Sequence, residues 1–106
     1  SAQSKPTVAL IRADWCRACQ QLEPTYNELK QQYGSRINFV EFDVTNEETT
    51  AAAEARAKNL GLGKFFAANK KNTSTVAVFK GGKQTFTANH NYDRETYVNA
   101  FEKALK

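Results

Sequence analysis

The stretch that decides the fold is DWCRAC, residues 14–19 of a chain of 106. Its cysteines, Cys16 and Cys19, are three positions apart and are the only 2 in the sequence. A disulfide that staples a small scaffold normally bridges distant points of the chain, so a pair this close does not form a structural framework. The thiolate is the nucleophile in disulfide exchange, and a closely spaced pair suits that chemistry. The sequence therefore indicates that Cys16 and Cys19 are reacting groups.

The flanking residues predict a strand before this stretch and a helix after the first cysteine. Residues 7–11, TVALI, are apolar and rich in β-branched side chains, as in a buried strand. From Cys16 to Tyr33 apolar residues recur at helical spacing, and Gly34 follows as a stop. Pro24 falls inside this helix and should kink it, because proline removes a backbone donor and crowds the preceding turn. We therefore expect the cysteine pair at a helix N-terminus, directly behind a buried strand.

The rest of the chain predicts an α/β fold of order β-α-β-α-β-β-α. The expected elements are a strand at 37–44, a helix at 46–60, a polar connection at 64–72, strands at 75–79 and 84–88, and a helix after 93. Phe65 and Phe66 are the apolar anchors of the polar connection, and Gly81-Gly82 forms a tight hairpin turn. The first β-α-β unit implies a parallel crossover and the hairpin an antiparallel pair, so we expect a central four-stranded mixed sheet flanked by helices.

Composition describes one globular domain and excludes several classes of protein. Hydrophobic residues make up 41% and charged residues 25% of the chain, which is ordinary for a globular protein. We expect a single domain over 1–106, with 1–6 as a flexible N-terminal segment, and a monomer. The net charge of +4 is spread out instead of forming a dense basic stripe, so nucleic-acid binding is not expected. No apolar run approaches the roughly 18 residues of a membrane span.

The cysteine stretch and its surroundings resemble the thioredoxin superfamily. A tryptophan precedes the pair, and Pro24 lies eight residues after Cys16, where thioredoxins have their helix-kinking proline. The run FKGG at 79–82 is similar to the turn between the family's last two strands. The resemblance covers about 7–105 and implies a thioredoxin-like fold. It also implies a thiol–disulfide oxidoreductase acting on protein thiols and disulfides, with an upstream redox partner and no cofactor besides a redox-active Cys16–Cys19 disulfide.

The two cysteines are expected to have different roles. Cys16 lies at the helix N-terminus, where unpaired backbone donors and the macrodipole favour negative charge, and Arg17 adds a neighbouring cation. We therefore expect Cys16 to be the attacking thiol. Cys19 lies one turn inside the helix and is expected to be the more buried, resolving thiol.

One departure from the family pattern shapes the expected substrate groove. The family's cis-proline before the third strand is absent, and Ser74 takes its place. We expect a trans Thr73–Ser74 bond, because a cis bond before a non-proline residue costs about 2.5–4 kcal/mol. The expected substrate-binding residues are Trp15, Arg17, Thr73 and Ser74. The alternative for Trp15 is packing in the core.

A second departure concerns the proton that Cys19 must lose before it attacks. Thioredoxins resemble one another in having a buried acid beneath the disulfide, but this chain has Leu10 at that place. Glu41 lies in the middle of an otherwise apolar strand, where thioredoxins place a lysine that pairs with the acid. We expect Glu41 to transfer the proton if it is buried there. The alternative is that Glu41 faces solvent or meets a basic side chain.

Two other classes of function remain open. The first is a metal-binding module, in which His90 would join the two cysteines. Three such ligands fall short of the four of a structural zinc site, and a lone loop histidine is more often solvated, so no metal ligand is predicted. The second is a peptide-binding module that keeps the scaffold without turnover. The polar start at 1–5, SAQSK, resembles a mature exported terminus and favours an extracytoplasmic location, periplasmic or membrane-tethered, over a cytoplasmic one.

Overall fold

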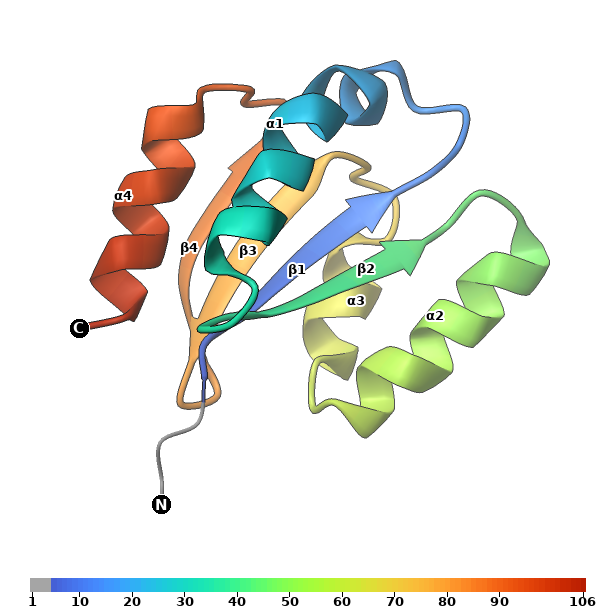
Figure 1. The fold of residues 1–106 in the computed structure, drawn as a ribbon. Coiled ribbons are helices and arrows are strands. Elements are labelled where there is room, and N and C mark those ends of the chain that lie inside the picture. Colours follow the sequence, from blue (N-terminus) through green and yellow to red (C-terminus); the bar gives the residue numbers. More distant parts are fainter. Residues whose placement is uncertain (1–4) are drawn as a thin grey trace.

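The computed structural model describes residues 5–106, which form four strands and four helices (Figure 1). The elements are β1 (Thr7–Arg12), α1 (Arg17–Tyr33), β2 (Asn38–Asp43), α2 (Glu47–Asn59), α3 (Gly63–Asn69), β3 (Thr75–Lys80), β4 (Lys83–Asn89) and α4 (Arg94–Ala104). Of the expected N-terminal segment 1–6, residues 1–4 lie outside the described residues. Pro6 is buried, and its carbonyl accepts a hydrogen bond of 2.9 Å from the Asn38 N–H. The described part of this segment is thus attached to the start of β2.

The four strands form one mixed sheet in the order β2-β1-β3-β4. β1 runs parallel to β2 and antiparallel to β3, and β3 is antiparallel to β4. This confirms the expected four-stranded mixed sheet. Because β1 and β2 are parallel, the segments that follow Arg12 and Asp43 emerge at the same edge of the sheet. The Val44 N–H continues the pairing with a hydrogen bond of 2.8 Å to the Arg12 carbonyl. The DWCRAC stretch therefore begins beside the residues that follow β2.

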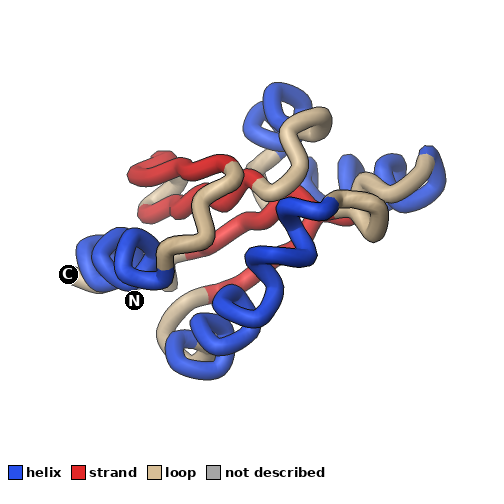
Figure 2. The backbone as a smooth tube through the Cα atoms, turned by 90° about the horizontal axis from the view of Figure 1, so that it is seen from above, coloured by secondary structure: helices blue, strands red, loops and turns tan. Residues whose placement is uncertain are grey.

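Helices cover both faces of the sheet (Figure 2), and each face has its own hydrophobic cluster. On one face α1 and α4 enclose large aromatic side chains, among them Tyr26, Tyr33 and Phe101. On the other face α2 and α3 pack around Phe42 and Phe66, and this cluster also holds the two cysteines. The cysteine pair is therefore continuous with the core. None of the helices that the structure describes is long and apolar enough to cross a membrane.

The structure corrects one expected element, because a helix replaces most of the polar connection at 64–72. Gly63–Asn69 forms α3, and its two phenylalanines are both buried. The Phe66 ring lies 5.5 Å from that of Phe42, and the Phe65 ring lies 5.2 Å from that of Phe79. The role of both residues as apolar anchors is thus confirmed. So short a helix shows no hydrophobic period in sequence, and these tertiary contacts stabilise it instead.

The hairpin between β3 and β4 turns at the two glycines that the sequence indicated. Gly81 has a φ of 59° and Gly82 a φ of 80°. A two-residue hairpin turn with positive φ at both positions matches the twist of the flanking strands and favours glycine. The expected turn is confirmed.

Candidate active site

Cys16 and Cys19 form a disulfide at the N-terminus of α1, with their Cα atoms 5.2 Å apart. Cys16 is the N-cap residue, and its Sγ accepts a hydrogen bond of 3.1 Å from the Cys19 N–H. This sulfur takes the place of the serine, threonine or aspartate oxygen that usually caps a helix. Arg17, exposed, is the first residue of the helix. The unpaired donors of the first turn and the helix dipole favour negative charge on the Cys16 sulfur.

Burial does not separate the two cysteines as expected. Cys16 is 5% exposed and Cys19 8% exposed, so the expectation that Cys19 is the more buried is wrong. The Cys16 N–H bonds the Ala13 carbonyl at 3.1 Å, and this turn brings the cap residue into the core cluster. The two differ in their surroundings instead. The Cys19 Sγ lies 4.0 Å from the Ile11 carbonyl oxygen, and Cys19 lines a cavity between α1 and the strands β1 and β2.

Trp15 lies on the surface beside the cysteine pair. It is 63% exposed, so packing in the core is excluded. Its indole Nε1–H donates a hydrogen bond of 2.9 Å to the Thr45 carbonyl, and the Asp14 N–H donates one of 2.9 Å to the Thr45 hydroxyl. The Asp43 carboxylate holds Thr45 in turn. It accepts a hydrogen bond of 2.8 Å from the Thr45 N–H and another from the Thr45 hydroxyl. Thr45 thus ties the segment before Cys16 to the end of β2.

Asp43 carries the charge at the centre of this network. Its Oδ2 lies 3.0 Å from Nη1 of Arg12, and the same guanidinium contacts Asp14 through Nη2 at 2.7 Å. Partial burial raises the pKa of Asp43, but the hydrogen bonds from Thr45 and the charge of Arg12 outweigh it. The pKa of Asp43 consequently lies below its usual value. The ionised carboxylate is the form that this part of the structure stabilises.

The Thr73–Ser74 segment differs in part from the expectation. No cis peptide bond occurs among residues 5–106, so the expected trans bond is confirmed. Ser74 is fully buried, has a φ of 69°, and donates its N–H to the Ile11 carbonyl at 2.7 Å. Its side chain therefore offers no surface to a substrate. Thr73 is half-buried, and its carbonyl accepts a hydrogen bond of 3.1 Å from the Asn89 side chain. Of the two residues, only Thr73 can still face the groove.

His90 does not assemble a metal site with the cysteines. It is exposed, and its backbone N–H donates to the Ser74 carbonyl at 3.3 Å. In the part of the chain that the structure describes, no three His, Cys, Asp or Glu side chains lie together in a group that could hold a metal ion. The metal-binding alternative therefore has no ligand set among these residues.

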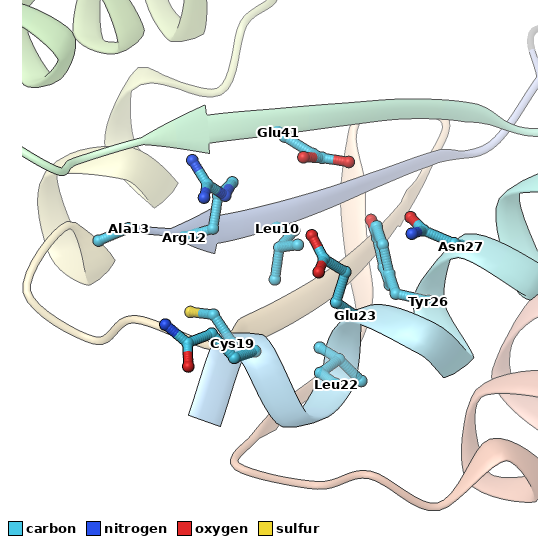
Figure 3. Close-up of a pocket in the computed structure, with 10 residues that line it drawn as sticks. Leu10, Arg12, Ala13, Cys19, Leu22, Glu23, Tyr26, Asn27 and Glu41 are labelled. Carbon is cyan, nitrogen blue, oxygen red and sulfur yellow. The ribbon is translucent and has the colours of Figure 1, made fainter. Parts of the chain in front are cut away.

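Glu41 lines the cavity that also contains Cys19 and Leu10 (Figure 3). Its Oε2 lies 2.6 Å from Nζ of Lys30 on α1, and the two side chains are 35% and 36% exposed. Glu41 is therefore not fully buried beneath the disulfide, and it meets a basic side chain, as the alternative stated. A role in proton transfer would have to operate across the cavity.

Arg12, Thr45 and Lys30 are residues of the site that were not predicted from the sequence. Arg12 ends β1 and Thr45 follows β2, two neighbouring parallel strands. Side chains at the carboxyl ends of such strands commonly form binding sites, so this signal was present in the sequence. Lys30 had no comparable signal, because its partner comes from a strand that lies 11 residues further along the chain.

Comparison with known sequences places the chain in a family. The family model Thioredoxin matches residues 1–85. The chain therefore belongs to the thioredoxin family. A thioredoxin-like protein HCF164, chloroplastic, from Oryza sativa subsp. japonica is 44% identical over 45 residues, which are 42% of this chain and 17% of that protein. A thiol:disulfide interchange protein TxlA homolog from Synechocystis sp. is 41% identical over 44 residues, or 42% of this chain and 24% of that protein. The chain thus matches less than a quarter of these relatives' length.

Solved structures show the same fold along nearly the whole chain. Thioredoxin F from spinach chloroplast is 23% identical with a TM-score of 0.66, covering 99% of this chain and 80% of that one. Fasciola hepatica thioredoxin is 16% identical with a TM-score of 0.67, covering 97% and 84%. These likenesses confirm the expected thioredoxin-like fold.

Replacing Asp43 with asparagine should make the protein's stability less sensitive to acid. The pKa of Asp43 is lower in the folded chain than its ordinary value. Its contribution to stability is therefore present above about pH 4 and is lost as the pH falls through the folded pKa. Urea unfolding at stepwise pH should show this loss in the wild type and a smaller one in Asp43→Asn. Glu54→Gln, an exposed site on α2, is the control. Identical acid dependence in Asp43→Asn and the wild type would show that Asp43 does not hold this network.

Proposed function

We propose that the protein is a thiol–disulfide oxidoreductase that exchanges disulfides with protein substrates through Cys16 and Cys19. The observation that carries the proposal is the disulfide at the start of α1, with the Cys16 sulfur as the helix cap. A sulfur in this position is stabilised as a thiolate when the disulfide is reduced. Membership of the thioredoxin family supports the same activity, as does the similarity to a protein named for thiol:disulfide interchange.

In the reducing direction the exchange proceeds in two steps. The Cys16 thiolate attacks a substrate disulfide, a mixed disulfide forms, and the first substrate sulfur leaves as a thiolate. Cys19 then loses its proton and attacks Cys16, which forms the Cys16–Cys19 disulfide and releases the second substrate sulfur. Two electrons pass from the dithiol to the substrate, and an upstream redox partner restores the dithiol. The same steps in reverse oxidise a substrate dithiol.

The surface beside the pair suits a polypeptide substrate. Trp15 is mostly exposed, yet its hydrogen bond to Thr45 fixes its indole ring. A surface hollow of about 330 Å³ adjoins this ring and is lined by Val44, Thr50, Lys70 and Lys71. A fixed aromatic ring offers contact area at low entropic cost. We propose that Trp15 contacts the substrate, together with the exposed Arg17 and the half-buried Thr73.

The cellular location of the protein is also part of the proposal. The expected extracytoplasmic location, periplasmic or membrane-tethered, stays a prediction. Among the relatives, HCF164 from rice is named as a chloroplastic protein.

Two single variants separate the roles of the cysteines. Cys19→Ser retains the attacking thiol and should accumulate a mixed disulfide with a disulfide-containing test protein, visible as an adduct by mass spectrometry. Cys16→Ser should give no adduct and no reduction. Alkylation of the reduced wild type at mildly acidic pH should label Cys16 first, because the helix start favours its thiolate.

Labelling of Cys19 first, or an adduct on Cys16→Ser, would reverse the role assignment. If the wild type and Cys16→Ser both bind the test protein and neither reduces its disulfide, the protein is a peptide-binding module instead.

Although Glu41 is part-exposed and paired with Lys30, it lines the same cavity as Cys19, and we therefore keep it as the proposed proton acceptor. Glu41→Gln keeps the shape of the side chain but removes the carboxylate, and should slow release of the mixed disulfide about tenfold or more at neutral pH. Lys30→Gln is the matched control, because it breaks the same ion pair but keeps the carboxylate. Rapid-mixing kinetics over a range of pH measure the release of the mixed disulfide in both variants. An unchanged pH–rate profile in Glu41→Gln, or an equal loss in Lys30→Gln, would exclude Glu41 as the acceptor.

A further inference from the structure

Basic side chains that are dispersed in the sequence gather at the end of the sheet opposite the disulfide. The start of β1, the α1–β2 and α2–α3 connections, the β3–β4 hairpin and the end of α4 all lie at that end (Figure 1). In these segments and the two residues on either side of each, every charged residue that the structure describes is basic and exposed. We call this surface the basic end; its cations are Lys5, Arg36, Lys58, Lys64, Lys80, Lys83, Lys103 and Lys106.

Shared hollows show that these connections form one surface. One hollow lies between the α2–α3 connection and the hairpin, and its lining includes Lys64 and Gly82. Another lies between the α2–α3 and α1–β2 connections, and its lining includes Leu60 and Gly34. The α2–α3 connection thus borders both the hairpin and the end of α1, and the cations of the basic end belong to one continuous surface.

Acidic side chains do not neutralise the basic end. Among residues 5–106 no ion pair involves any of its cations. Glu102, which precedes Lys103 in the last turn of α4, accepts a hydrogen bond of 2.6 Å from the Tyr33 hydroxyl. The disulfide end carries both signs instead: Arg17, Lys70 and Lys71 with Asp14, Glu47, Glu48, Asp93 and Glu95. The fold therefore concentrates the positive charge of the chain at one end.

An apolar side chain is exposed within the basic end. The Leu60 N–H bonds the Arg56 carbonyl at 3.0 Å, which closes the last turn of α2. Leu62 then packs into the core, whereas Leu60 is 50% exposed, and Lys58 and Lys64 flank it in the sequence. A single exposed leucine is ordinary on a protein surface. Set among cations, however, it offers a side chain that fits the boundary between lipid headgroups and acyl chains.

We propose that the basic end docks on an anionic lipid surface, with Leu60 at the headgroup boundary and the disulfide facing away from the lipid. Lysine is a compact charge on a flexible stem, and each lysine near an anionic lipid layer adds to binding. The surface fits other anionic partners less well. Single-stranded nucleic acids stack on exposed aromatic rings, and protein partners use aromatic anchors. The exposed large aromatic side chains among the described residues, Trp15 and Tyr92, both lie at the disulfide end.

Co-sedimentation of the full chain with lipid vesicles tests this docking. The wild type should bind vesicles of equal parts phosphatidylcholine and phosphatidylglycerol, but not vesicles of phosphatidylcholine alone. Binding should weaken as salt is raised, because salt screens exposed charges. Lys58→Gln/Lys64→Gln should lower the partition coefficient about tenfold or more. Leu60→Ser should lower it about fivefold, because less apolar surface enters the lipid.

The matched control is Lys70→Gln/Lys71→Gln, which removes the same charge from the disulfide end. Its partition coefficient should stay within about twofold of the wild type, because these lysines lie beyond the screening length from the docked surface. The orientation has its own measurement. Alkylation of reduced Cys16 by iodoacetamide should be as fast on vesicles as in solution.

Four results would overturn the inference. They are absent binding to the anionic vesicles, equal binding to phosphatidylcholine alone, equal losses in the two lysine pairs, and slower alkylation of Cys16 on vesicles. Polyglutamate or duplex DNA that binds as tightly as the vesicles at equal charge concentration would also overturn it, because the basic end would then serve another class of partner. Lipid binding needs no disulfide exchange, so a wild type that reduces no disulfide contradicts only the proposed function.

Discussion

The hydrogen bond from the Cys19 N–H to the Cys16 sulfur is the interaction on which the site depends. It makes a reacting atom the cap of α1, so that the helix begins at Arg17 and this sulfur lies at the end of the helix that carries its unpaired donors. Capping normally contributes about 1 kcal/mol to a helix. Here the same contact also favours the thiolate needed for attack. Helix initiation and activation of the nucleophile are therefore one feature of the structure.

The sheet holds this helix start in place. Parallel pairing of β1 and β2 brings their carboxyl ends together, and Thr45 joins them by hydrogen bonds to Asp14 and Trp15. Asp43 fixes Thr45 and is itself paired with Arg12. These contacts leave Trp15 exposed but fixed beside the disulfide. A partner polypeptide would meet a surface that is already ordered, which lowers the entropic cost of binding.

Local signals in the sequence predicted the features that local chemistry determines. Strand and helix periodicity, the two-glycine turn and the position of Cys16 at a helix start were all apparent without a structure. Features that depend on contacts between residues far apart in the sequence were not apparent without a structure. Helix α3 exists because Phe65 and Phe66 meet rings from two strands, and Ser74 is buried because its backbone bonds the strand of Ile11. The Lys30–Glu41 pair joins a helix to a strand, and no spacing rule reveals it.

The reduction potential of the Cys16–Cys19 pair tests most directly whether this disulfide is a working redox centre. Wild-type protein would be equilibrated in thiol–disulfide buffers of known potential, and its two redox states separated by mass after alkylation. Stabilisation of the Cys16 thiolate by the helix favours the reduced form. A single two-electron transition between about −270 and −120 mV, the span of thioredoxin-type catalysts, is the predicted result. A potential below about −300 mV, typical of structural disulfides, would contradict a redox role for the pair.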